Sequence, residues 1–357
     1  RLRRMFAAHC SAAEKLKMAE RAACAGKYRE EDYRYAAAKV SAMSCELIPE
    51  ARIRELARAR DAAEVMSRIA EYGFDAAADG TEAALTAYLA ERYETLLSFC
   101  PSTPLAQLCR MRYDCNNLKS AIKCRAGGRD AAPLMIRCGL IPADDVIAAA
   151  EKNDFSVFAK TLPNMSRAAD MASEALGKSG NSRTVDSLLD RACFADMRTA
   201  ARATGIREVV ALLERKTDAT NLLTAARVLR LRDAGMRRAV FDDSVISGGK
   251  IDMKKLRDAD SLQTLAALAD DAGYPDAARA LRSAGSDAAS LERMSHAFDD
   301  DFRAAVDAAT RMQLLGAYPV IGYIAALEYE VKNLRIILSG IEAGDDRSLI
   351  EERLRIA

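Results

Sequence analysis

One stretch of the sequence has the residue types of a phosphate-binding loop. Ala172 to Ser179 fits the permissive form of that motif, with alanine in place of the first glycine. Phosphate binding would need a strand before the loop and a helix after it, so that free backbone N–H groups surround the anion. Here residues 166–175 have helical composition, and a glycine and an asparagine follow where a helix should begin. We therefore predict no nucleotide site, and we expect Gly177 to cap the end of a helix.

Other reactive side chains are few or poorly spaced for catalysis. The two histidines, His9 and His296, lie far apart in the sequence, which disfavours a histidine-based metal site. Asp299-Asp300-Asp301 could bind a cation, but we expect a solvated helix start, where negative charge opposes the helix dipole favourably. The nine cysteines are odd in number and form no Cys-x-x-Cys pair, which favours reduced, buried thiols over a disulfide framework. We predict no catalytic, metal or cofactor site.

Charge and hydropathy exclude two broad classes of protein. Lysine plus arginine number 53 and aspartate plus glutamate 52, so the chain lacks the basic excess that is typical of nucleic-acid-binding domains. The longest apolar stretch, Gly316 to Leu327, is interrupted by Pro319 and Gly322 and is shorter than the ~20 residues that a spanning helix needs. We expect no nucleic-acid partner and no membrane-spanning segment.

Helices must position any functional residue in this chain. Strong helix formers dominate, and apolar residues recur at three- and four-residue intervals, as in Leu85, Tyr88, Leu89 and Tyr93. No long run alternates with period two, so we expect no sheet. Clusters of glycine, proline and asparagine divide the chain into helices of about 10 to 25 residues, the length range of packed bundles. The sequence predicts an all-α fold.

A pattern of acid, two residues, asparagine and leucine occurs three times. The acids and asparagines are Asp114 and Asn117, Asp218 and Asn221, and Glu330 and Asn333. Asparagine is a mediocre helix former because its amide competes for backbone bonds, so we expect each amide to be buried and to bond a neighbouring backbone group. The acid lies on the same helix face. Three separate catalytic sites are the alternative, but equivalent structural roles in three homologous bundles are simpler.

Basic charge gathers in two regions, 99–140 and 196–239, and acidic charge gathers in 299–342. Ordinary solvated faces are one explanation. Contact with surfaces rich in aspartate and glutamate is the other, and such contacts weaken with salt. The candidate contact residues are Arg110, Arg112, Lys119, Lys123, Arg227, Arg230 and Arg232.

The third copy carries a specific resemblance. Gly316 to Arg335 reads Gly-Ala-Tyr-Pro-Val-Ile-Gly-Tyr-Ile-Ala-Ala-Leu-Glu-Tyr-Glu-Val-Lys-Asn-Leu-Arg. This stretch resembles the C-terminal signature of the C subunit of archaeal and bacterial V-type (A-type) ATPases, which is homologous to the d subunit of the eukaryotic vacuolar enzyme. Tyr33 to Ile48 resembles the opening of that family, and the likeness covers residues 33–357. The second copy departs from the others, because Leu223 stands in the place of a basic residue.

The resemblance implies an architecture of three related helical-bundle domains, arranged with pseudo-threefold symmetry in a funnel-shaped molecule. We expect domains at residues 33–130, 131–240 and 241–357, the last with the C-terminal signature helix, after a leading helical extension at 1–32.

The resemblance also implies a function without catalysis. The chain would be a central-stalk subunit of a V-type ATPase or ATP synthase, peripheral on the cytoplasmic face of the membrane. It would be a socket that joins the membrane rotor ring to the central shaft and transmits torque between ion translocation and ATP synthesis or hydrolysis. The implied partners are the ring and shaft subunits, with no cofactor and no small-molecule substrate. A free-standing helical scaffold or interaction protein is the alternative.

Overall fold

The fold is all-helical, as the sequence predicts. The computed structural model describes residues 28–75, 78, 80–285, 288–311 and 315–356, and these residues contain helices and turns but no strand. Residues 1–27 of the predicted leading extension, with His9, Cys10 and Cys24, lie outside the described residues. Among the described helices, none is long and apolar enough to cross a membrane.

Three helices carry the three copies of the repeat. They are α8 (Met111–Ala126), α12 (Arg207–Val228) and α18 (Tyr318–Ala343). Asn221 and Asn333 lie in the second half of their helices. The first copy differs, because α7 (Thr103–Leu108) ends before α8 begins, and Asn117 therefore lies near the middle of α8. Ser102 caps α7, since its hydroxyl accepts the N–H of Leu105.

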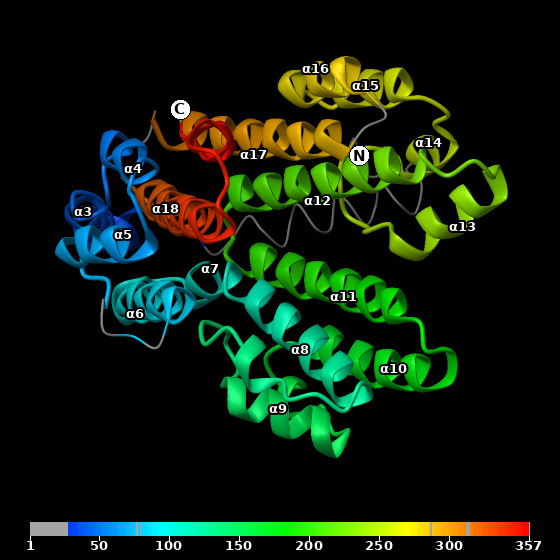
Figure 1. The fold of residues 1–357 in the computed structure, drawn as a ribbon, viewed down its shortest axis with the longest axis horizontal. Coiled ribbons are helices and arrows are strands. Elements are labelled where there is room, and N and C mark those ends of the chain that lie inside the picture. The colour runs from blue at the N-terminus through cyan, green and yellow to red at the C-terminus, as the bar shows by residue number, and fades with distance from the viewer. Residues whose placement is uncertain (1–27, 76–77, 79, 286–287, 312–314, 357) are drawn as a thin grey trace, which may run out of the picture.

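The remaining helices gather in groups around these three (Figure 1). Around α8 lie α9 (Ala143–Lys152), α10 (Pro163–Ser179) and α11 (Ser182–Ala203). Around α12 lie α13 (Ala234–Ser244), α14 (Met253–Asp258), α15 (Leu262–Asp271), α16 (Pro275–Ser283) and α17 (Ala288–Arg311), with α16 packed on α15 and α17. Short 3-10 turns occur at Glu30–Tyr33, Ala70–Tyr72, Ala132–Leu134 and Ser156–Phe158.

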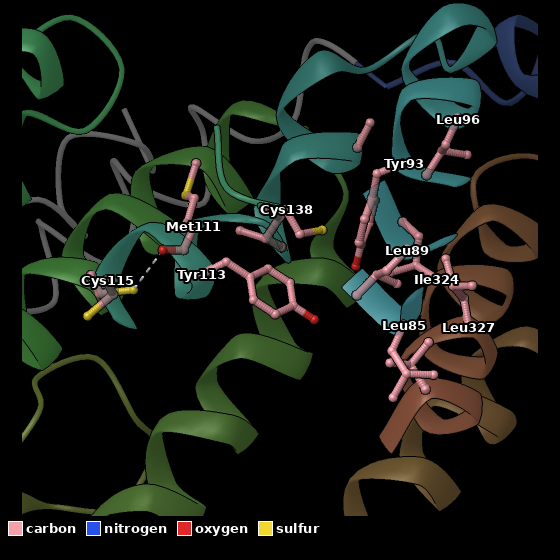
Figure 2. Close-up of a cluster of buried hydrophobic side chains, with 14 of the residues drawn as sticks. Leu85, Leu89, Tyr93, Leu96, Met111, Tyr113, Cys115, Cys138, Ile324 and Leu327 are labelled. Carbon is pink, nitrogen blue, oxygen red and sulfur yellow. Dashed lines mark hydrogen bonds between the residues drawn. The ribbon is translucent and has the colours of Figure 1, made fainter. Parts of the chain in front are cut away.

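The group around α18 is built from both ends of the chain. It contains α3 (Arg34–Ser44), α4 (Glu50–Leu56), α5 (Ala62–Ile69), α6 (Thr81–Phe99) and α19 (Arg347–Arg353). Leu85 and Leu89 of α6 lie beside Ile324 and Leu327 of α18 in one apolar cluster (Figure 2). These contacts cross the predicted division between residues 33–130 and 241–357. The three-domain division itself stays a prediction.

The molecule has two apolar cores, and α12 contributes residues to both. The larger core combines residues from the first 213 positions with residues from 306 onward, whereas the smaller core lies within residues 222–298. Leu213 packs in the larger core and Leu222 in the smaller one, and both are buried. The helix that carries the second copy therefore ties the two cores together.

One local prediction, the helix cap, was wrong. Gly177 lies inside α10, which continues to Ser179, and the cap is Gly180, whose φ of 66° is in the left-handed region that glycine adopts without strain. Ala172 to Ser179 is therefore continuous helix, without the free N–H groups of a phosphate loop.

The seven described cysteines are free, and five of them are buried.

Candidate functional site

Each repeated asparagine binds one backbone residue through both ends of its amide. The Nδ2 group donates to the C=O of that residue, and Oδ1 accepts its N–H, with all six bonds between 2.7 and 3.1 Å. The backbone partners of Asn117, Asn221 and Asn333 are Ile136, Ile246 and Arg355, in that order. The three asparagines are at most 3% exposed. This burial and backbone bonding is what the sequence pattern predicts for the amides.

The acids of the first two copies hold the same turns as their asparagines. Each carboxylate accepts the N–H groups of two successive residues, one on each oxygen, at 2.8 to 3.1 Å. The donors are Leu140 and Ile141 for Asp114, and Lys250 and Ile251 for Asp218. Asp218 also accepts the hydroxyl of Tyr274 at 2.6 Å. Acid and amide together fix one segment of backbone, which leads into α9 in the first copy and runs from α13 into α14 in the second.

A glycine before each donor pair lets the carboxylate approach the turn. A Cβ atom on Gly139 would lie 2.4 Å from Oδ1 of Asp114, and one on Gly249 would lie 1.9 Å from Oδ1 of Asp218. Real side chains do not come this close, so both positions require glycine for steric reasons. The sequence pattern did not predict this steric role, although each glycine stands two residues before an isoleucine that precedes a new helix.

The acid of the third copy reaches across the chain. Oε1 of Glu330 accepts the N–H of Ile48 at 2.6 Å, although the two residues are 282 positions apart. Its second oxygen is buried and makes no hydrogen bond within the described residues. Burial raises the pKa of Glu330 to about 7, against the opposing effect of the Ile48 N–H. Burial also raises the pKa of Asp114, to about 6, although two N–H groups lower it.

A second polar cluster lies where the repeat helices meet. Arg112, Lys216 and Glu328 each stand two residues before the acid of their copy. Arg112 forms an ion pair with Glu328, and Glu328 also accepts the hydroxyl groups of Tyr93 and Tyr113. Figure 2 shows these two tyrosines extending from α6 and α8 toward a common space. The sequence signal for this cluster was present but unused: one charged position recurs at the same offset in all three copies.

Asp299 lies at the base of the same cluster. Lys332, Arg355 and Lys216 contact its carboxylate, the last with Nζ at 3.9 Å from Oδ1. Burial would raise the pKa of Asp299, but Lys332 and Lys216 hold it below its ordinary value. Its neighbour Asp301 is 6% exposed and pairs with Arg215. The expected helix start was therefore wrong: the run lies in the middle of α17, where basic side chains pair with Asp299 and Asp301, while Asp300 is exposed.

The basic candidates of the first region are used inside the molecule. Arg110 is 8% exposed and donates to Glu94 and to two backbone carbonyl groups, at Cys138 and Gly139. Lys119 and Lys123 reach from α8 to α11, where their ion-pair partners are Asp190 and Asp186. A contact role for these three side chains stays a prediction, but it would require that they exchange existing partners.

The candidates of the second region lie in a different environment. Arg227, Arg230 and Arg232 are exposed at the end of α12 and in the turn toward α13. In the part of the chain that the structure describes, their guanidinium groups have no ion pair. No group of three histidine, cysteine, aspartate or glutamate residues that could hold a metal ion occurs among the described residues. The site thus contains three structural clamps, each formed by the acid and the asparagine of one copy together with the backbone groups that they bind. It also contains exposed cationic surfaces.

Comparisons with known proteins agree with the resemblance in the sequence. The model of the family described as ATP synthase (C/AC39) subunit matches residues 36–353. The C subunit of the A-type ATP synthase of Thermococcus kodakarensis is 26% identical over 340 residues, which cover 90% of this chain and 89% of that protein. The C subunit of the V-type sodium ATPase of Enterococcus hirae is 24% identical over 287 residues, which cover 80% of this chain and 84% of that protein.

Proposed function

The chain belongs to the ATP synthase (C/AC39) subunit family, and on that premise we propose that it is a central-stalk subunit of a rotary ATPase or ATP synthase. Like the C subunits that it is similar to, it is an accessory subunit of the rotary complex and not a catalytic one. In this proposal it is a socket on the cytoplasmic face of the membrane, which joins the rotor ring to the central shaft and passes torque between them.

The closure of the chain is the observation that carries this role. A part that transmits torque must resist local unfolding, and contacts between segments that are distant in the chain limit such unfolding. Here Glu330 binds Ile48, and Arg303 forms an ion pair with Glu50. Both contacts fasten the N-terminal helices to the C-terminal ones. The fold is thereby closed on itself, which suits a stiff adaptor.

The proposal includes three related bundles around a pseudo-threefold axis, in a funnel-shaped molecule. Residues near a symmetry axis come from equivalent positions, and Arg112, Lys216 and Glu328 are such positions in the three copies. Arg112 pairs with Glu328, and its charge acts on Lys216. This convergence supports an axis at the junction of α8, α12 and α18. In this arrangement α3 to α6 complete the bundle of α18.

The exposed arginines are the proposed contacts with partner loops. Arg227, Arg230 and Arg232 have no internal ion pair among the described residues, so a partner carboxylate would not have to displace one. They suit polar loops that are rich in aspartate and glutamate, such as a ring could offer, and attraction of this kind weakens with salt.

Recovery of the tagged chain from membranes of the cells that make it tests the proposal. The membranes are solubilised under conditions that keep rotary complexes intact, and the bound proteins are identified by mass spectrometry. We expect ring and shaft subunits in stoichiometric amounts. Recovery of the chain without them, while the intact complex is present in the same extract, contradicts the proposal and favours a free-standing scaffold.

A further inference from the structure

Three cations at the junction of α8, α12 and α18 remain partly exposed, although each of them contacts a carboxylate. The side chains of Arg112 and Lys216 are each 45% exposed, and that of Lys332 is 40% exposed. The carboxylates that they contact lie beneath them: Glu328 is 14% exposed and Asp299 is 15% exposed. The outer surface of this junction is therefore positive, although its base contains acids.

Lys216 has the weakest internal partner of the three. Its Nζ lies 3.9 Å from Asp299, which Lys332 and Arg355 also contact. Burial lowers the pKa of Lys216; Asp299 opposes this effect, while the charges of Arg112 and Lys332 add to it. A further negative group at this place would offset both the repulsion and the lost hydration of the ammonium group. The structure thus places a half-exposed cation where an external carboxylate is favourable.

We propose that these three residues, the cationic junction of Arg112, Lys216 and Lys332, are the seat of a carboxylate-rich end of a partner helix. The inference rests on the proposed function, in which that partner is the central shaft. The three cations come from three different helices, but Lys216 and Lys332 contact the same Asp299, and the charge of Arg112 acts on Lys216. This proximity is what would let one narrow helix end contact all three. A helix C-terminus adds the negative end of its own dipole. Hydrogen bonds between carboxylates and these cations are charge-assisted.

The exposed arginines of the second region make a matched control surface. Arg227 and Arg230 lie on the last turn of α12 and just after it, whereas Lys216 lies about three turns before Arg227 on the same helix. Both surfaces are cationic and exposed. If any exposed cation attracted an acidic partner equally, the two surfaces would be equivalent. If the junction is a defined binding site, only substitutions at the junction should weaken binding to the shaft.

Lys216→Gln is the most informative variant, because Asp299 keeps Lys332 and Arg355 and because the side chain keeps its approximate length. We would measure binding of the full chain to purified shaft subunits from the same cells by titration calorimetry at low salt. We expect Lys216→Gln to weaken binding about fivefold and Lys216→Glu to weaken it at least about tenfold. Arg227→Gln and Arg227→Glu should bind the shaft like the parent. Raising the salt concentration should reduce the difference between Lys216→Gln and the parent.

The outcomes separate this inference from the function on which it rests. Equal affinity of the parent and both Lys216 variants overturns the seat and leaves the socket role standing. An equal loss in the Arg227 variants also overturns it, in favour of general attraction. Failure of the parent chain itself to bind the shaft contradicts the proposed function. If Lys216→Glu loses its helical circular dichroism signal, the Lys216→Gln result decides alone.

Discussion

The first two copies of the repeat and the third make similar clamps from different parts of the chain. Asp218 holds a turn no more than 33 positions away, and Asp114 holds one that is closer still. Glu330 instead holds Ile48, 282 positions away. Two clamps thus fix the segments that lead into α9 and α14, whereas the third joins α18 to the segment between α3 and α4.

The local clamps and the third clamp also differ in the sizes of their residues. Both local clamps combine an aspartate with a glycine directly before the donor pair, because the carboxylate lies against the backbone. In the third clamp Glu46 takes the place of that glycine, and the acid is a glutamate, which is one methylene longer. It accepts one backbone N–H instead of two. The position of the clamp is thus repeated in all three copies, but the close approach of the carboxylate to the backbone occurs only in the first two.

Adding a methyl group at the glycine of a local clamp should have the largest effect. Gly249→Ala places Cβ against Asp218, so the carboxylate must move and lose two charge-assisted N–H bonds. We expect a loss of about 3 to 5 kcal/mol in the free energy of unfolding, measured by urea denaturation. Gly139→Ala should behave alike, whereas Glu46→Ala should cost less than about 1 kcal/mol. Equal effects at Gly249 and Glu46 would remove the distinction between the clamps.

The pH dependence of stability should identify the third clamp. The pKa of Glu330 is raised to about 7 in the folded protein, so between about pH 4.5 and 7 the folded state holds a proton that the unfolded state has released. Stability from this group is therefore present at low pH and lost as pH rises through about 7. Relative to Glu330→Gln, the free energy of unfolding of the parent should fall by up to about 3 kcal/mol between about pH 5 and pH 8.

Thermal or urea unfolding at a series of pH values measures this difference between parent and variant. The raised pKa of Asp114 contributes with the same sign in both proteins, so it cancels in the comparison. If the difference in the free energy of unfolding between parent and Glu330→Gln does not change with pH, the pKa of Glu330 is not raised and its contact with Ile48 is hydrated.

Removing the amides should affect all three clamps. Asn117→Leu, Asn221→Leu and Asn333→Leu each leave a backbone N–H and C=O without a partner, at an expected cost of about 1 to 3 kcal/mol. Asn116 is exposed beside the first clamp, so Asn116→Leu is the matched control and should leave thermal unfolding nearly unchanged. The structural role would be wrong if all three variants unfolded like the parent.

Charge reversal at the exposed arginines should have the smallest effect on stability and a clear one on coupling. Replacing Arg227, Arg230 and Arg232 together by glutamate should change the free energy of unfolding by less than about 1 kcal/mol, because exposed charges contribute little. We expect ATP-driven ion pumping in reconstituted vesicles to fall, with helicity retained. Unchanged pumping would show that this surface does not contact the ring.

Local patterns predict local features of this fold, and they miss contacts between distant segments. The all-α class and the buried amides follow from periodicity and from the poor helix propensity of asparagine. The Glu330–Ile48 contact does not, because no pattern links two residues at opposite ends of a chain. Asp299 was misjudged for the same reason: the basic side chains that neutralise it come from α12, α18 and the C-terminal segment. The cap of α10 is likewise beyond local pattern, because only backbone geometry distinguishes Gly180 from the predicted Gly177.

Coupling between ATP hydrolysis and ion pumping tests the central claim most directly. The rotary complex is reconstituted in vesicles with and without this chain, and both rates are measured on the same preparation. The account predicts that complexes with the chain pump ions as they hydrolyse ATP, and that complexes without it hydrolyse ATP without pumping. Pumping that remains proportional to hydrolysis in the absence of the chain would contradict the role of a socket between ring and shaft.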